Sequence, residues 1–177
     1  ILAATLLTNE ECIIDNLPLV EDIFNMIEVL KSMGAEINWV GERKIKIKTS
    51  SVAPQNMDFN KISKTRISVL LFGSLISRSK HFRIPPPGGD RIGLRPISVH
   101  LKALEKLGAK ISRTDDFYEI NCENLKGNEI ILEEFSVTAT ETLMLAATLT
   151  DGLTIIKGAA CEPHVQDLGK ILKNMGA

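Results

Sequence analysis

The residues from Pro85 to Pro96 combine stiff, flexible and charged residues in one short segment, Pro-Pro-Pro-Gly-Gly-Asp-Arg-Ile-Gly-Leu-Arg-Pro. The prolines fix φ and favour an extended approach, whereas the glycines allow positive φ and let a ligand come close to the backbone. One carboxylate, Asp90, and two guanidiniums, Arg91 and Arg95, lie among these glycines. The pattern is typical of a loop that closes over an anionic substrate, and equally of a solvated surface turn.

The charged residues of this segment suggest acid catalysis beside a phosphate. Guanidinium groups bind phosphate and carboxylate through paired hydrogen bonds. A free aspartate has a pKa of about 3.9, so Asp90 can donate a proton near neutral pH only if burial or a negative substrate raises that value. The net charge of the chain is only −1, so any anion site must be local.

The composition fits one domain with a sizeable core. Of the 177 residues, 44% are hydrophobic and 24% are charged, and the few aromatic residues give no platform for stacking nucleic-acid bases. Cys12, Cys122 and Cys161 share no metal-ligand spacing, so we expect reduced thiols and a cytoplasmic protein. We find no signal peptide and no membrane-spanning run. The chain begins without methionine and stops in mid-pattern, so we expect a piece of a longer protein.

An internal repeat with a period of about 70 residues organises the chain. An amphipathic helix end followed by glycine occurs at 29–35, 103–109 and 171–177, and apolar segments at 1–7, 69–75 and 144–150 predict a buried helix before each. Between the two helices of each unit we predict a strand, at 11–17, 81–86 and 153–157. Paired strands follow at 36–40 with 44–48 and at 110–112 with 117–121, and a lead-in strand is predicted at 129–133.

Each unit therefore has the order helix, strand, helix, strand, strand. We place the repeats at about 1–50, 58–123 and 129–177, the third without its final two strands, within a single incomplete domain covering 1–177. The lysines that alternate along the strand at 44–48 predict a solvated face.

Together these features resemble the enolpyruvyl transferases. The matching residues form one collinear register over nearly the whole chain: 1–7, 16–18, Asp22, Arg66, 87–89, 92–93, 95–96, His100, 136–137, 139–140, 146–147, 152–156, 162–163 and Asp167. The resemblance implies an α/β fold of the inside-out α/β-prism type, with buried helices and outer sheets. It also implies a second domain that is absent from this chain, so we expect the isolated chain to bind substrate weakly and to be inactive.

The reaction implied by the resemblance is transfer of the enolpyruvyl group of phosphoenolpyruvate to the 3′-hydroxyl of UDP-N-acetylglucosamine, the first committed step of bacterial peptidoglycan synthesis, without a metal or organic cofactor. Asp90 stands where many members carry cysteine, and the resemblance makes it the general acid. Arg95 matches the arginine that holds the phosphate of phosphoenolpyruvate, and Arg66 matches another in the same site. Because aspartate cannot undergo the thiol alkylation by which fosfomycin disables cysteine-bearing members, we expect insensitivity to that antibiotic.

Two further segments match the nucleotide site of the family, namely Pro96, Ile97, Ser98 and Val99 in the first, and Ser136, Val137 and Thr138 in the second. The family usually has a lysine two positions before that serine, where this chain has Glu134, and usually has glycine in place of Thr138. His100 suits a structural role as well as a binding role, and Asp22 and Glu162 are predicted first as helix caps.

Two other functions stay open on this sequence. One is an enolpyruvyl transferase with another acceptor, such as shikimate 3-phosphate. The other is a non-catalytic binding module derived from the family, which Glu134 favours because a carboxylate repels a diphosphate.

Overall fold

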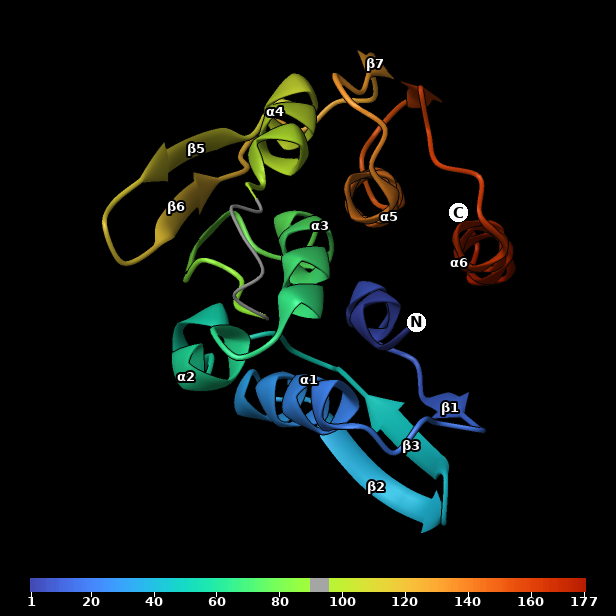
Figure 1. Ribbon diagram of the computed structural model, residues 1–177. Coiled ribbons are helices and arrows are strands. Elements are labelled where there is room, and N and C mark those ends of the chain that lie inside the picture. Colours follow the sequence, from blue (N-terminus) through green and yellow to red (C-terminus); the bar gives the residue numbers. More distant parts are fainter. Residues whose placement is uncertain (90–95) are drawn as a thin grey trace.

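Helices form the interior of the computed structural model, and small β-sheets lie around them (Figure 1). The structure describes residues 1–89 and 96–177. Three similar units follow one another along the chain, coloured blue to teal, green to yellow, and orange to red in Figure 1. In the described part of the chain, no helix is long and apolar enough to cross a membrane.

The elements of each unit are as follows. Unit one contains the 3₁₀-helix η1 (Leu2–Leu7), β1 (Cys12–Ile14), α1 (Glu21–Ser32), β2 (Glu36–Gly41) and β3 (Lys44–Lys48), and η2 (Pro54–Asn56) and α2 (Phe59–Ile62) link it to the next. Unit two contains η3 (Arg66–Val69), α3 (Leu70–Ile76), β4 (His81–Ile84), α4 (Ser98–Lys106), β5 (Lys110–Arg113) and β6 (Tyr118–Asn121). Unit three contains β7 (Glu129–Ile131), α5 (Val137–Ala147), β8 (Ile155–Lys157) and α6 (Pro163–Asn174).

The predicted order of helices and strands is confirmed, but several strands are shorter than predicted. β4 ends at Ile84 because the three prolines that follow have no N–H for the ladder. β1 ends at Ile14 because the chain turns at Asn16, whose φ is 56°.

The sheets of the first two units have the same topology. The strand orders are β1-β3-β2 and β4-β6-β5, and every pair is antiparallel. In β3 the apolar side chains Ile45 and Ile47 are buried, whereas Lys44 and Lys46 face outward and pair with Asp15 and Glu11, each at 2.8 Å. The predicted polar face is therefore confirmed, and its lysines pair with acidic residues flanking β1.

A left-handed glycine ends the second helix of each unit. Gly34, Gly108 and Gly176 have φ values of 104°, 107° and 106°. The predicted glycine caps are therefore confirmed in all three units, and the same backbone turn leads the chain out of α1, α4 and α6.

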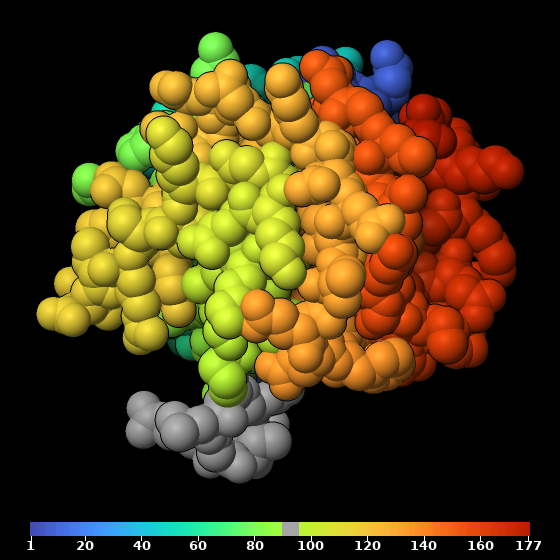
Figure 2. Space-filling view, turned by 90° about the horizontal axis from the view of Figure 1, so that it is seen from above, coloured from blue at the N-terminus to red at the C-terminus, as the bar shows by residue number. Residues whose placement is uncertain are grey.

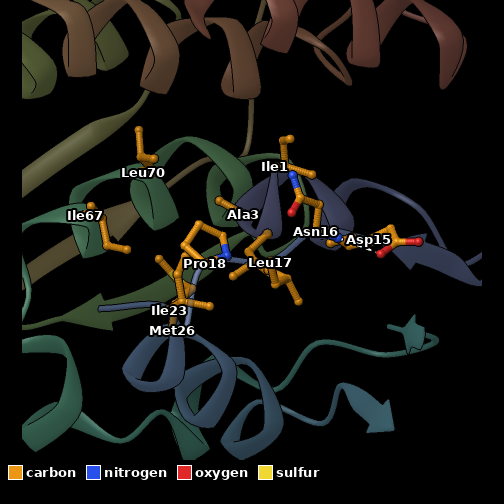
Figure 3. A pocket seen from close by; sticks show the side chains of 12 residues that line it. Ile1, Ala3, Asp15, Asn16, Leu17, Pro18, Ile23, Met26, Ile67 and Leu70 are labelled. Carbon is orange, nitrogen blue, oxygen red and sulfur yellow. Dashed lines mark hydrogen bonds between the residues drawn. The ribbon is translucent and has the colours of Figure 1, made fainter. Parts of the chain in front are cut away.

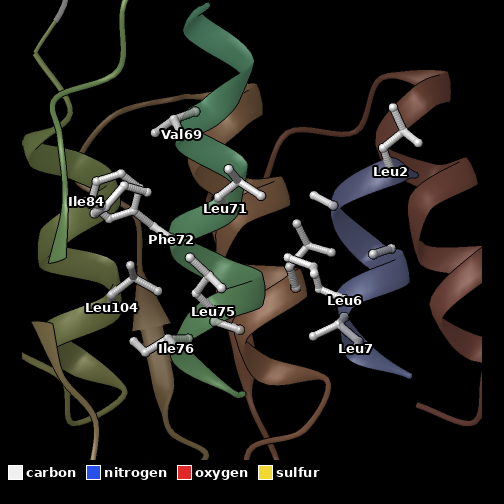
Figure 4. Packing of buried hydrophobic residues seen from close by; sticks show 14 of the residues in the cluster. Leu2, Leu6, Leu7, Val69, Leu71, Phe72, Leu75, Ile76, Ile84 and Leu104 are labelled. Carbon is white, nitrogen blue, oxygen red and sulfur yellow. The ribbon is translucent and has the colours of Figure 1, made fainter. Parts of the chain in front are cut away.

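The first helices of the units, η1, α3 and α5, meet at the centre, where α3 packs against both η1 and α5. Figure 4 shows α3 between η1 and α4, with Phe72 directed toward Ile84. Ser74 of α3 donates to the carbonyl of Ala3 in η1 at 2.7 Å, and Ser77 donates to the carbonyl of Ala146 in α5 at 2.8 Å. Small hydroxyl side chains thus join the backbones of the three helices.

Gly73 permits the close approach of α3 to α5. A Cβ at this position would lie 2.1 Å from the carbonyl oxygen of Thr142 and 3.1 Å from the Cβ of Leu145. Gly73→Ala is therefore expected to force the helices apart and to lower the free energy of unfolding by about 2–3 kcal/mol, measured by urea denaturation. Gly169→Ala in α6 is the control, because its nearest atom is the flexible Cε of Met144 at 3.3 Å. Equal losses in both variants would contradict this account of α3–α5 packing.

Candidate active site

The proline-glycine segment contacts the end of α2 and the residues that follow it. Gly88 donates to the carbonyl of Ile62 at 3.5 Å, and a Cβ on Gly88 would lie 1.8 Å from the carbonyl oxygen of Ser63. Gly89 has φ 107°, and a Cβ added at this position would lie 3.0 Å from the Cβ of Arg66. Glycine is needed at 88 for close approach and at 89 for positive φ.

Arg66 contacts the predicted loop at Gly89 and at Pro96. Its backbone and Cβ lie beneath Gly89, and its Nη2 donates to the carbonyl of Pro96 at 3.3 Å. The predicted catalytic residues Asp90 and Arg95 fall within 90–95, outside the described residues, so their roles remain predictions. Arg66 nevertheless contacts Gly89 and Pro96, which are the described residues on either side of 90–95.

The two predicted nucleotide-binding segments lie at the starts of neighbouring helices. Ser98 and Val99 begin α4, after the exposed Pro96 and the buried Ile97. Ile97 is at the N-cap position, where its apolar side chain cannot accept from the first-turn amides.

The start of α5 has a polar cap and joins the start of α4. Ser136 accepts a hydrogen bond from the Ala139 amide at 3.3 Å, and the half-buried Val137 and Thr138 form the first turn. His100 Nε2 of α4 lies 2.8 Å from Thr138 Oγ1. The structure thus brings together segments that are about 40 residues apart in sequence, although the family glycine is absent at 138.

The central helices run in parallel, so their N-termini gather at one end. Gly73 of α3 faces Thr142 of α5. Four residues further along both helices, the Ser77 hydroxyl donates a hydrogen bond to the Ala146 carbonyl. Toward η1, the Ser74 hydroxyl donates a hydrogen bond to the Ala3 carbonyl, and further along Arg78 Nη2 donates to Asn9 Oδ1 at 2.7 Å.

The outer helices start at the same end. α6 runs in the same direction as α5. Glu141, early in α5, interacts with His164 early in α6, and Met144 further along α5 lies against Gly169 further along α6. Helix N-termini carry partial positive charge and free N–H groups, so this end of the molecule favours anions. Arg66 adds a full positive charge there.

His100 is a buried neutral imidazole behind these helix starts. Its side chain is 4% exposed. Burial, and then the positive charge of Arg66, lower the pKa of His100 to about 4. Near neutral pH it therefore serves as an uncharged hydrogen-bonding link between α4 and Thr138, which fits the structural alternative considered from sequence.

This lowered pKa makes His100 a source of acid instability. The unfolded chain takes up a proton near pH 6.5 and the folded chain only near pH 4. The unfolded state thus binds more protons in this window, and stability falls as the pH drops through it, by about 3 kcal/mol in full. His100→Gln can keep a hydrogen bond to Thr138, and we expect it to lose correspondingly less stability between pH 7 and pH 4 in urea titrations. Parallel pH curves for the two proteins would contradict the buried neutral imidazole.

A family model described as EPSP synthase (3-phosphoshikimate 1-carboxyvinyltransferase) matches residues 1–177. The chain belongs to this family of carboxyvinyl transferases. Proteins named UDP-N-acetylglucosamine 1-carboxyvinyltransferase align with the whole chain, at 46% identity in Clostridium tetani and 40% in Bradyrhizobium diazoefficiens. The chain spans 43% and 41% of the lengths of these two relatives. The predicted resemblance to enolpyruvyl transferases is confirmed.

Solved structures agree on the carboxyvinyl transferase fold. The enolpyruvyl transferase NikO from Streptomyces tendae matches 99% of this chain and 41% of its own, with a TM-score of 0.85 at 18% identity. An EPSP synthase from Acinetobacter baumannii matches 93% of this chain and 40% of its own, with a TM-score of 0.67 at 17% identity. The predicted α/β prism architecture is therefore confirmed, and these distant matches support the fold alone.

Two acidic residues of this carboxyvinyl transferase chain do not cap helices as predicted. Val20, rather than Asp22, is the N-cap residue of α1, and Asp22 Oδ1 instead accepts from the buried Thr65 hydroxyl at 2.6 Å. Glu162 is the N-cap residue of α6 but makes no capping bond. Asp22 thus holds the residue before Arg66, a positioning role that the sequence pattern alone did not predict.

An apolar hollow of about 270 Å³ lies beside the Arg66 segment (Figure 3). Its walls come from η1, the connection between β1 and α1, α1 itself, η3 and the start of α3, and they include Pro18, Ile23, Ile67 and Leu70. Such a lining does not suit phosphate groups. The positive charge of Arg66 and the partial positive charges of the helix starts lie outside this hollow.

Proposed function

We propose that this chain is the loop-carrying part of a UDP-N-acetylglucosamine 1-carboxyvinyltransferase, which transfers the enolpyruvyl group of phosphoenolpyruvate to the 3′-hydroxyl of UDP-N-acetylglucosamine and releases phosphate. The observation that carries this proposal is the whole-chain identity of 40–46% to proteins of that name. The gathering of Arg66 and the starts of α4 and α5 supports it, because both substrates are anions.

The transfer requires protonation of C3 of phosphoenolpyruvate, attack of the sugar 3′-oxygen on C2, and loss of the 3′-hydroxyl proton. The C2–O bond to phosphate then breaks, and C3 gives up a proton to restore the double bond. We assign Asp90 as the general acid that protonates C3 or the leaving phosphate, and Arg95 as a phosphate ligand. Arg66 binds in the same anionic site and positions the loop through Pro96.

For the nucleotide, we assign the backbone at Pro96, Ile97, Ser98 and Val99 to the uridine. The first turn of α5, comprising Ser136, Val137 and Thr138, is assigned to the diphosphate, with N–H groups as donors. The proposed reaction needs no cofactor and belongs to peptidoglycan synthesis in the bacterial cytoplasm.

We further propose that the whole protein contains a second domain that completes the site, because the chain spans only 43% and 41% of the lengths of the two curated relatives. The isolated chain is therefore expected to bind substrate weakly and to be inactive.

Shikimate 3-phosphate is the second candidate acceptor, because the family model carries the EPSP synthase description. A phosphate-release assay of the full-length parent with phosphoenolpyruvate separates the candidates. We expect release with UDP-N-acetylglucosamine and none with shikimate 3-phosphate. Release only with shikimate 3-phosphate would establish the second candidate. Release with neither acceptor would favour the non-catalytic binding module.

A further inference from the structure

Lys102 joins the first half of α4 to the segment that leads to α5. It follows Ser98 by four residues, one turn along the same face of α4. Its Nζ lies 2.6 Å from Glu133 Oε2, and Glu133 precedes Ser136, the N-cap residue of α5, by three residues. In Figure 2 the yellow-green surface of α4 adjoins the orange surface of the segment that leads to α5.

The approach to α5 carries two adjacent carboxylates. Glu133 and Glu134 are both exposed. Since like charges repel, a diphosphate at the first turn of α5 needs a nearby cation to offset these two charges. The hydrogen bond and charge of Glu133 raise the pKa of Lys102, so Lys102 is a cation throughout the neutral range.

We propose that Lys102 is a specificity-determining residue that binds the diphosphate of the nucleotide sugar, leaving Glu133 for a phosphate oxygen when the substrate arrives. This inference rests on the proposed function, since it names a ligand within the same site. The ion pair with Glu133 is exposed on both sides, with 52% and 49% of the two side chains accessible. Such a pair holds little free energy, so exchanging it for a doubly charged diphosphate at a helix N-terminus is favourable.

Lys106 provides a matched control on the same helix face. It follows Lys102 by four residues, and its Nζ donates to the carbonyl of Ile131 at 3.0 Å. It is therefore a similar exposed lysine of α4 that contacts the same segment leading to α5, but it lies one turn further from the start of α4. A general loss of positive charge on α4 would affect both lysines alike, whereas a diphosphate contact requires Lys102.

The test is calorimetric titration of the full-length parent with UDP-N-acetylglucosamine and with uridine. Lys102→Met is expected to weaken binding of the nucleotide sugar about 10-fold, with uridine binding and the KM for phosphoenolpyruvate unchanged. Lys102→Arg should restore most of the affinity, and Lys106→Met should behave like the wild type. Thermal melting checks that each variant is folded.

The outcomes separate this inference from the proposal beneath it. Wild-type protein that fails to bind UDP-N-acetylglucosamine would overturn the proposed function, and the role of Lys102 with it. Normal wild-type binding that Lys102→Met leaves unchanged would overturn the Lys102 assignment alone. Equal losses in Lys102→Met and Lys106→Met would also overturn it, because they would indicate a diffuse charge effect.

Discussion

Asp90→Asn is expected to lower the kcat of the full-length enzyme about 10²–10⁴-fold, the usual contribution of a positioned general acid. Asparagine keeps the size and polarity of aspartate but has no acidic proton to give to C3 or to the leaving phosphate. Binding of UDP-N-acetylglucosamine should change little. The measurement is steady-state phosphate release with titration of both substrates. An unchanged kcat in Asp90→Asn would contradict the role of general acid assigned to this residue.

Asp90→Cys is the matching gain-of-sensitivity variant. Because the resemblance places cysteine at this position in many members, we expect Asp90→Cys to retain turnover. Its thiol can be alkylated by fosfomycin, whereas the wild-type carboxylate cannot. The wild-type protein should therefore keep full activity during preincubation with the antibiotic, and the variant should lose activity with time. Equal inactivation of both proteins would contradict the placement of Asp90 at the reactive position.

Arg66→Lys is expected to lower kcat/KM for phosphoenolpyruvate about 100-fold or more, because an ammonium cannot reproduce the planar fork of guanidinium donors. Arg66 also holds Pro96 through Nη2 at 3.3 Å, so the loss should include poorer positioning of the loop. Steady-state kinetics with phosphoenolpyruvate varied provides the measurement.

Arg78→Lys is the control for Arg66→Lys. Arg78 follows the C-terminus of α3, at the opposite end of the helix that η3 and Arg66 precede, and its Nη2 donates to Asn9 Oδ1 at 2.7 Å. We expect activity close to wild type. Comparable losses at both ends of α3 would indicate a global effect on the domain, and the local role of Arg66 would have to be abandoned.

Local sequence signals predicted most of the fold. Gly34 and Gly108 marked the helix ends because only glycine adopts the left-handed cap at little cost, and Ile45 and Ile47 marked the inner face of β3 because side chains alternate along a strand. Strand ends were predicted less well. The alternating pattern continued past Ile14, and the turn at Asn16 ended β1 early.

The arrangement of the candidate site depends on contacts that no local pattern reveals. The carboxylate of Asp22 looked like a helix cap, but tertiary packing gives it the hydroxyl of Thr65. Likewise, only the fold shows that Gly89 lies on Arg66 and that His100 reaches Thr138. Lys102 was not predicted from the sequence, because only the fold brings it into contact with Glu133.

The most direct test of the central claim is to run the reaction of the full-length parent in deuterium oxide with phosphoenolpyruvate and UDP-N-acetylglucosamine. Protonation at C3 followed by loss of a proton from the same carbon predicts deuterium in the methylene group of an enolpyruvyl-UDP-N-acetylglucosamine product, detected by NMR and mass spectrometry. Phosphate release without that product, or a product formed without any deuterium at C3, would contradict enolpyruvyl transfer by protonation and deprotonation at C3.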